Sequence, residues 1–193
     1  MIERTQGKLV VISGPSSVGK STICRAVVER TGAHLSVSTT TRPKGPREED
    51  GREYHFVSRE AFEEGIRNDA FLEYAEVFGN YYGTPHSEVD APLREGKTVI
   101  LEIDVQGARK IKLIRPDVIM IFILPPTPKD LSDRMTGRGR GEDEKTAALR
   151  LNTASREIAA AWQYYKHMVI NADLEQAIRE VIDIIQGHSG DSK

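Results

Sequence analysis

The stretch that most constrains this chain is Gly14-Pro-Ser-Ser-Val-Gly19-Lys20-Ser21, which satisfies the pattern G-x-x-x-x-G-K-[ST]. It follows the β-branched run Lys8–Ser13, which predicts a strand. It precedes Lys20–Arg30, whose apolar residues have helical spacing and which closes at Gly32. The strand, loop and helix order is the setting that a phosphate-binding loop requires, and it disfavours the alternative of an ordinary glycine-rich turn.

In such a loop the backbone N–H groups converge on phosphate oxygens, and the N-terminus of the following helix adds partial positive charge. We expect Lys20 to reach the outer phosphates and Ser21 to ligate Mg²⁺. The loop therefore predicts that the chain binds a nucleoside triphosphate. The residues expected to contact it in the loop are Gly14, Pro15, Ser16, Ser17, Val18, Gly19, Lys20, Ser21 and Thr22.

Four further apolar runs predict strands of a buried parallel sheet, because they are apolar on both faces. Helical stretches separate most of these runs, which predicts right-handed crossovers and an α/β fold. Two helix starts are marked by capping residues, Thr127 before Pro128 and Asp173 before an amphipathic stretch that Gly187 ends. The four strand candidates are Leu35–Ser38, Thr98–Ile103, Val118–Leu124 and Met168–Ile170.

Composition excludes several classes of protein. The 193 residues carry 27 Lys and Arg against 29 Asp and Glu, and a net charge of −2 gives no global attraction to nucleic acid or to an anionic membrane. The longest apolar run, Val118–Leu124, is far shorter than a membrane helix. The only cysteine, Cys24, excludes an intramolecular disulfide, and the N-terminus lacks the form of a signal peptide. We expect a cytoplasmic protein without nucleic-acid, membrane or obligate protein partners.

Two stretches interrupt the alternation of strands and helices. Residues 39–92 are polar and too long for one crossover loop, so we expect them to form an inserted substrate domain. Residues 127–156 carry several arginines separated by glycines, which predicts a mobile arginine-bearing lid. Residues 1–38, 93–126 and 157–193 would then form the core that holds the phosphate loop.

Five further motifs follow the phosphate loop along the chain: Ser38–Arg42, Gly51–Phe56, Phe71–Ala75, Gly79–Thr84 and Leu101–Gly107. With these six motifs at compatible spacing, nearly the whole chain, from Leu9 to Asp173, resembles guanylate kinase. The resemblance implies the nucleoside monophosphate kinase fold, with a five-stranded parallel core, a GMP-binding domain and a lid. It also implies the reaction of ATP with GMP to give ADP and GDP.

The resemblance also implies which residues hold GMP. A carboxylate such as Glu73 can accept two hydrogen bonds from the N1–H and 2-amino edge of guanine, a donor pair that adenine does not present. Arginine and tyrosine side chains suit a dianionic phosphate. Taken singly, each of these residues could instead be a surface charge or a packing residue. The resemblance places Ser38, Glu73, Thr84 and Asp104 at the guanine, and Arg42, Tyr54 and Tyr82 at the GMP phosphate.

The chain departs from the family pattern in two places, the first just after Arg42 and the second in the lid. The family usually has a second phosphate-binding arginine three residues after the first, and this chain has Gly45 at that position. Either Lys44 or Arg47 could replace it, and we prefer Arg47 because its forked side chain suits a phosphate.

The catalytic assignment combines the loop with the lid. Lys20 and Mg²⁺ supply positive charge from the core, Arg42 holds the acceptor phosphate, and Arg138 and Arg150 are the candidates from the lid. Arg140 could replace Arg138, because Arg138 and Arg150 lie one residue further apart than the family pattern, and any lid arginine could instead pair with surface carboxylates.

Two further residues have two readings each. Glu102 could lie near Mg²⁺ or the ribose, or pair with a neighbour at the end of its strand. Asn171 sits where the family approaches the adenine of ATP, and it could equally be a residue of a turn.

Two alternative functions remain open on these observations. One is a kinase for another nucleoside monophosphate, and the other is a catalytically silent domain of this fold that binds phosphorylated peptides. The presence of Lys20 and Ser21 disfavours the silent domain.

Overall fold

The computed structural model describes residues 7–136 and 144–188, apart from the side chains of residues 135–151. It separates into two compact units. The first comprises Met1–Leu9, Ala33–Leu101 and Gln106–Val118, and the second comprises Val10–Gly32, Glu102–Val105 and Ile119–Lys193. The predicted division into core, substrate domain and lid is a different one, based on role, and it stays a prediction.

A five-stranded sheet has the order β2-β7-β1-β8-β9, as expected for the α/β fold predicted from the sequence. The pairs β2·β7, β1·β8 and β8·β9 are all parallel. Side chains on both faces are buried: Val10, Val11 and Ile12 of β1 are fully inaccessible. The strands are β1 (Leu9–Ser13), β2 (His34–Leu35), β7 (Val99–Glu102), β8 (Ile119–Leu124) and β9 (His167–Ile170).

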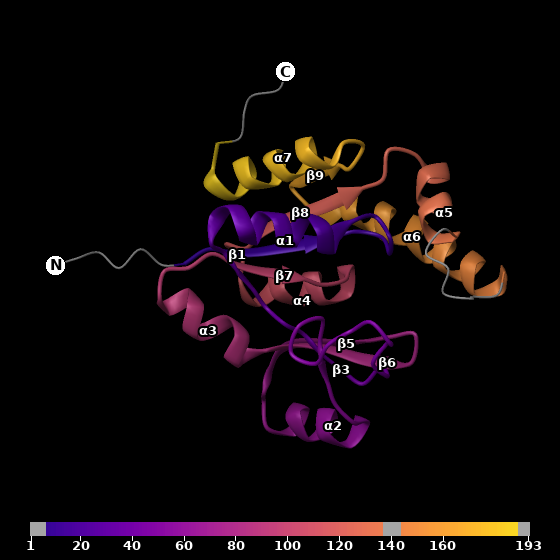
Figure 1. The fold of residues 1–193 in the computed structure, drawn as a ribbon. Helices are drawn as coiled ribbons and strands as arrows, with labels where there is room; N and C mark the ends of the chain where they lie inside the picture. The colour runs from indigo at the N-terminus through magenta and orange to yellow at the C-terminus, as the bar shows by residue number, and fades with distance from the viewer. Residues whose placement is uncertain (1–6, 137–143, 189–193) are drawn as a thin grey trace. The chain divides into compact units, whose positions relative to one another are not determined.

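In the second unit, α1 (Lys20–Thr31) packs against α7 (Leu174–Gln186), and the two helices run side by side in Figure 1. The predicted caps of α7 are confirmed, because the Asp173 carboxylate accepts a hydrogen bond from the Gln176 N–H at 2.8 Å and Gly187 ends the helix with a φ of 82°. The remaining helices of this unit are α5 (Pro128–Thr136) and α6 (Glu144–Tyr164).

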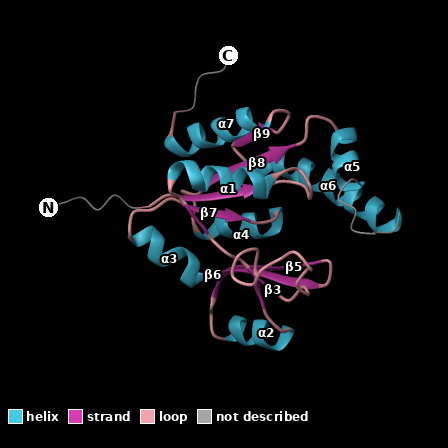
Figure 2. Ribbon diagram, viewed as in Figure 1, coloured by secondary structure: helices cyan, strands magenta, loops and turns pink. Residues whose placement is uncertain are grey.

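The first unit contains a second sheet of four strands in the order β4-β3-β6-β5. Its hairpin turns at Phe78 and Gly79, both with positive φ, as a type I′ hairpin turn requires. Phe62 of α2 stacks on Phe71 and Tyr81, so α2 covers this sheet (Figure 2). The elements are β3 (Thr39–Thr40), β4 (His55–Phe56), α2 (Arg59–Arg67), β5 (Phe71–Val77), β6 (Asn80–Pro85), α3 (His86–Arg94) and α4 (Val105–Ile114).

One predicted strand is shorter than expected. The run Leu35–Ser38 contributes only Leu35 to β2, and the chain leaves the sheet before it pairs again as β3. Among the described residues, no helix is both long enough and apolar enough to cross a membrane.

Candidate active site

The phosphate loop of the second unit joins β1 to α1 through backbone conformations that favour glycine. Gly14 has a φ of 151° and Gly19, at the N-cap of α1, has a φ of 105°. Each glycine also faces a close neighbour: a Cβ at position 14 would lie 2.5 Å from the Ile123 carbonyl oxygen, and one at position 19 would lie 2.5 Å from Asn171 Nδ2. The first turn of α1 contains no acidic residue, so its N–H groups and partial positive charge suit an anion.

The Lys20 ammonium folds back over this loop. Its Nζ donates to the carbonyl oxygens of Gly14 at 2.6 Å and of Pro15 at 3.0 Å. The side chain is part-buried, so the positive charge lies beside the N–H groups that would receive a phosphate chain. This is the position from which a lysine neutralises phosphate oxygens.

Ser21 and Glu102 form an oxygen pair next to the loop. The Ser21 hydroxyl donates to Glu102 Oε1 at 2.7 Å. Hydroxyl and carboxylate oxygens are the ligands that Mg²⁺ accepts, usually together with water and substrate phosphates. The pair therefore fits the Mg²⁺ expected at Ser21, although no cluster of three or more His, Cys, Asp or Glu among the described residues is arranged to hold a metal by itself.

Asn171 supports the loop from its far side. Its Nδ2 donates to the Val18 carbonyl at 2.9 Å, and the side chain is buried. Arg134 of α5 reaches the same place, because Nη1 donates to the Val18 carbonyl at 3.3 Å and Nη2 to the Asn171 carbonyl at 3.2 Å. These contacts give Asn171 a role in holding the loop, besides the adenine contact that its sequence position suggested.

Two ionisable groups lie in a part-buried cluster with the loop. Burial raises the pKa of the Glu157 carboxyl of α6 to about 7, while the positive charge of Lys20 opposes the rise and the negative charge of Asp104 adds to it. Burial also raises the pKa of the Tyr165 hydroxyl above its ordinary value. Burial raises the pKa of the Cys24 thiol as well, so this cysteine has no character of a nucleophile.

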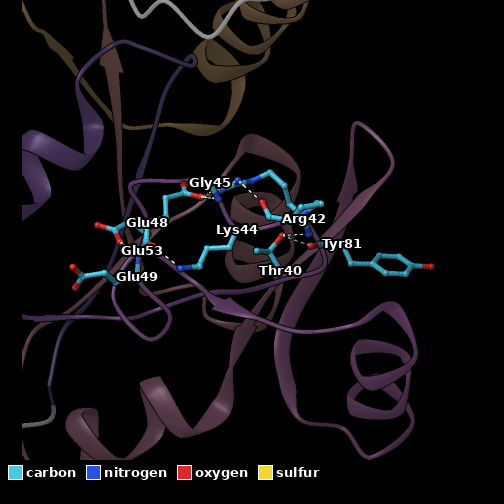
Figure 3. Close-up of polar contacts among 9 residues, drawn as sticks. Thr40, Arg42, Lys44, Gly45, Glu48, Glu49, Glu53 and Tyr81 are labelled. Atoms are coloured by element: carbon cyan, nitrogen blue, oxygen red, sulfur yellow. Dashed lines mark hydrogen bonds and ion pairs between the residues drawn. The ribbon is translucent and has the colours of Figure 1, made fainter.

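In the first unit, Arg42 is held by Glu48 in a two-pronged ion pair (Figure 3). Nη1 donates to Oε2 at 3.0 Å and Nη2 to Oε1 at 2.7 Å, and a second bond runs from Nη1 to the Pro43 carbonyl at 2.9 Å. The hydrogen bond with Glu48 raises the pKa of Arg42. Arg42 thus carries a full positive charge on a fork that already holds an oxyanion.

Two aromatic rings lie beside this guanidinium. Its central carbon lies 5.5 Å from the centre of the Tyr54 ring and 5.7 Å from that of Phe56. The Tyr54 and Tyr82 rings meet edge to face at 5.7 Å. The structure therefore brings together Arg42, Tyr54 and Tyr82, the three residues that the family resemblance assigns to one phosphate.

The two candidates for a second cation differ in their surroundings. Lys44 Nζ donates to the Glu48 backbone carbonyl at 3.2 Å, so it lies in the same loop as the Arg42 and Glu48 pair (Figure 3). Arg47 is exposed, and so is Lys44. Exposure therefore does not separate the two candidates, and the preference for Arg47 rests on its forked side chain.

The predicted base-reading residues also come together. The Thr84 hydroxyl donates to Glu73 Oε1 at 2.8 Å, and both residues are buried, Glu73 being 7% exposed. The Glu73 carboxylate lies against Gly107, where an added Cβ would come within 2.6 Å of Oε2. A buried carboxylate can accept hydrogen bonds from donor groups on the edge of a planar base, and the hydroxyl oxygen beside it can accept a further one.

The remaining predicted residues are Ser38, Asp104 and the lid arginines. Ser38 is half-buried just before β3. Asp104 belongs to the second unit and is near enough to Glu157 to raise the pKa of that carboxyl. Arg138 and Arg140 lie outside the described residues, and Arg150 lies in α6 with its side chain outside them.

Sequence reasoning missed three contributors. Glu48 stands in the acidic run Glu48-Glu49-Asp50, which resembles a solvated surface. Arg134 lies in the predicted lid, but the sequence does not distinguish it from the other arginines there. Glu157 gives no signal in the sequence, since its position near Lys20 depends on how α6 packs. The glycine at position 45 was the one available hint, because it marked the loop around Glu48 as unusual.

Similarity to known proteins extends over most of the chain. A family model described as guanylate kinase matches residues 6–188. A guanylate kinase of Clostridium acetobutylicum is 45% identical over 180 residues, which make up 93% of this chain and 85% of that protein. One from Synechocystis sp. is 44% identical over 182 residues, covering 93% of this chain and 94% of that protein. The crystal structure of guanylate kinase from Anaplasma phagocytophilum matches with a TM-score of 0.80 and 31% identity, over 97% of this chain and 89% of that chain.

Proposed function

This chain belongs to the guanylate kinase family, and from that premise we propose how its residues transfer the γ-phosphate of ATP to GMP, giving ADP and GDP. The proposal has three parts: a guanine site, an acceptor-phosphate site and a donor site. Each part is supported by contacts within one compact unit.

The guanine site is built on Glu73. Its carboxylate would accept hydrogen bonds from the N1–H and the 2-amino group of guanine, while Thr84 and Ser38 supply hydroxyls and Asp104 a further acceptor. The bond from Thr84 to the buried Glu73 carboxylate is the observation that carries this assignment. A base without that donor pair would displace water from this buried carboxylate and offer no hydrogen bonds in return, which is costly, so adenine and the pyrimidines would be rejected.

The acceptor-phosphate site is the group of Arg42, Tyr54 and Tyr82. The guanidinium supplies forked N–H donors and the two phenol groups supply hydroxyl donors, which together match the oxygens of a phosphate dianion. Arg47 would add a second positive charge to this site. Lys44, which donates to the Glu48 carbonyl in the same loop, is the alternative for that role.

The donor site is the phosphate loop from Gly14 to Thr22. Its N–H groups and the Lys20 ammonium would hold the phosphates of ATP, with Asn171 fixing the loop at Val18. Ser21, together with phosphate oxygens and Glu102, would hold Mg²⁺, and that ion supplies charge neutralisation when bound. Arg138, with Arg140 as its alternative, and Arg150 are proposed to cover the transferring group.

The chemical step needs no general base. A phosphate monoester is already largely dianionic near neutral pH, so an oxygen of the GMP phosphate attacks the γ-phosphorus directly. The new P–O bond forms as the bond to the β-phosphate oxygen breaks, and ADP leaves with that electron pair. The residues contribute by placing the reactants, neutralising charge and excluding water.

The test is a coupled assay of ADP formation with GMP, AMP, CMP and UMP as acceptors. We expect turnover with GMP alone, near-complete loss in Lys20→Ala, and loss of the preference for guanine in Glu73→Ala. Comparable turnover of another monophosphate would favour the alternative kinase, and GMP binding without any turnover would favour the silent domain.

We also propose that the chain acts in purine nucleotide metabolism, in the step that follows the formation of guanosine monophosphate. It also includes a reducing, cytoplasmic compartment, which the single and buried Cys24 supports.

A further inference from the structure

The side chain of Glu48 is the centre of the loop formed by residues 42–48. Its carboxylate occupies both ends of the Arg42 fork and also accepts the Gly45 N–H at 2.7 Å (Figure 3). Its backbone closes the turn, since the Glu48 N–H donates to the Gly45 carbonyl at 3.1 Å. The Lys44 ammonium donates to the Glu48 carbonyl. Arg42, Lys44 and Gly45 thus all contact Glu48.

This carboxylate holds the guanidinium as a substrate phosphate would. A carboxylate and a phosphate each present two oxygens to the paired N–H groups of an arginine. The Arg42 pair is only partly exposed, with 30% of the Arg42 side chain and 21% of the Glu48 side chain accessible. A phosphate dianion arriving at the same edge would lie beside a second anion in a weakly screened place, which is unfavourable unless the carboxylate moves away.

Gly45 makes room for this arrangement. A Cβ at position 45 would lie 2.9 Å from Glu48 Oε2 and 3.3 Å from Cδ. Gly45 is not among the residues with positive φ, so its backbone suits an ordinary L residue. The missing side chain at position 45 therefore matters through the space it leaves for the Glu48 carboxylate and not through backbone freedom.

We propose that Glu48 is an internal occupant of the acceptor-phosphate site, which the phosphate of GMP displaces from Arg42 when it binds. This inference rests on the proposed function, in which Arg42 holds the GMP phosphate. Glu48 then sets the affinity for the acceptor: each binding event exchanges one oxyanion for another on the same fork.

The exchange predicts a defined effect on affinity. If the fork is closed on Glu48 about 90% of the time, the apparent dissociation constant for GMP is about tenfold above that of an open fork. Guanosine lacks the phosphate and does not compete with Glu48, so its affinity does not depend on the state of the fork.

Two variants open the fork in different ways. Glu48→Gln removes the negative charge with little change in size, and Gly45→Ala pushes the carboxylate away while the charge stays. The matched control is Glu49→Gln, which removes a neighbouring negative charge that pairs with Arg52 and not with Arg42. Circular dichroism and a thermal melt check that each variant is folded.

The experiment is isothermal titration of GMP and of guanosine into the four proteins. We expect GMP to bind about tenfold more tightly to Glu48→Gln and several-fold more tightly to Gly45→Ala, with guanosine affinity unchanged and Glu49→Gln like the wild type.

Unchanged or weaker GMP binding by Glu48→Gln overturns the inference, because Glu48 would then only orient Arg42. Should that variant not fold, Gly45→Ala decides in the same way. If the wild type binds GMP and neither variant gains, only this inference fails. If the wild type binds no GMP at all, the proposed function fails with it.

Discussion

Glu157 makes the free energy of unfolding of this protein depend on pH, by an amount that follows from the structure. The carboxyl of this α6 residue has an ordinary pKa of 4.5, which burial raises to about 7 in the folded chain. Below pH 4.5 the group is protonated in both the folded and the unfolded chain and contributes nothing to the pH dependence. Between pH 4.5 and 7 the unfolded chain gives up the proton that the folded chain keeps, so the free energy of unfolding falls as pH rises.

The magnitude follows from linkage. The pKa of Glu157 is higher by about 2.5 in the folded chain than in the unfolded chain, and each unit corresponds to about 1.36 kcal/mol. Above pH 7 the free energy of unfolding is therefore lower by roughly 3 kcal/mol. Between pH 5 and pH 8 the change is about 2.5 kcal/mol. Glu157→Gln is uncharged at both pH values, so it removes this change and leaves the contributions of the other carboxyl groups in place.

The assay is urea denaturation of wild type and Glu157→Gln, followed by circular dichroism at pH 5 and pH 8. We expect the advantage of the glutamine variant over the wild type to grow by about 2.5 kcal/mol from the lower to the higher pH. A difference that is the same at both pH values would refute the reasoning, because Glu157 would then titrate alike in both states.

Three further variants test the phosphate loop and the N-terminal cap of α7. Gly19→Ala forces a side chain into a φ of 105° and against Asn171 Nδ2, so we expect the free energy of unfolding to fall by about 2–4 kcal/mol and ATP to bind more weakly. Thermal unfolding measures the first effect and calorimetry the second, and wild-type values in both would contradict the loop geometry. Asp173→Ala removes the cap on the Gln176 N–H and should cost about 0.5–2 kcal/mol in urea denaturation, whereas Asp173→Asn, which keeps a capping oxygen, should cost less; equal losses in the two variants would count against the cap.

The parts of the fold predicted well are those with local signals. The phosphate loop lies between a strand and a helix as expected, and α7 begins after Asp173 and ends at Gly187 because capping residues act within one turn. The strands of the large sheet were found since burial on both faces leaves continuous apolar runs. The two-residue strands β3 and β4 were not, because such short strands form through pairing with distant residues.

The candidate site shows the same limit. The pair of Glu73 with Thr84 and the group around Arg42 were expected from a resemblance spread over many motifs. The contact between Arg42 and Glu48 was not, since an acidic run carries no sign of which member turns inward. The environment of Glu157 likewise depends on packing between α6 and the loop, which periodicity does not reveal.

The central claim is that the acceptor of the γ-phosphate is GMP. Phosphorus NMR of one tube holding the wild-type chain, Mg²⁺, ATP and equal amounts of GMP and AMP observes both acceptors at once. The account predicts that the GMP resonance is replaced by the two resonances of GDP as ATP becomes ADP, while the AMP resonance keeps its intensity. Growth of inorganic phosphate in place of GDP, or loss of AMP at a rate like that of GMP, would contradict it.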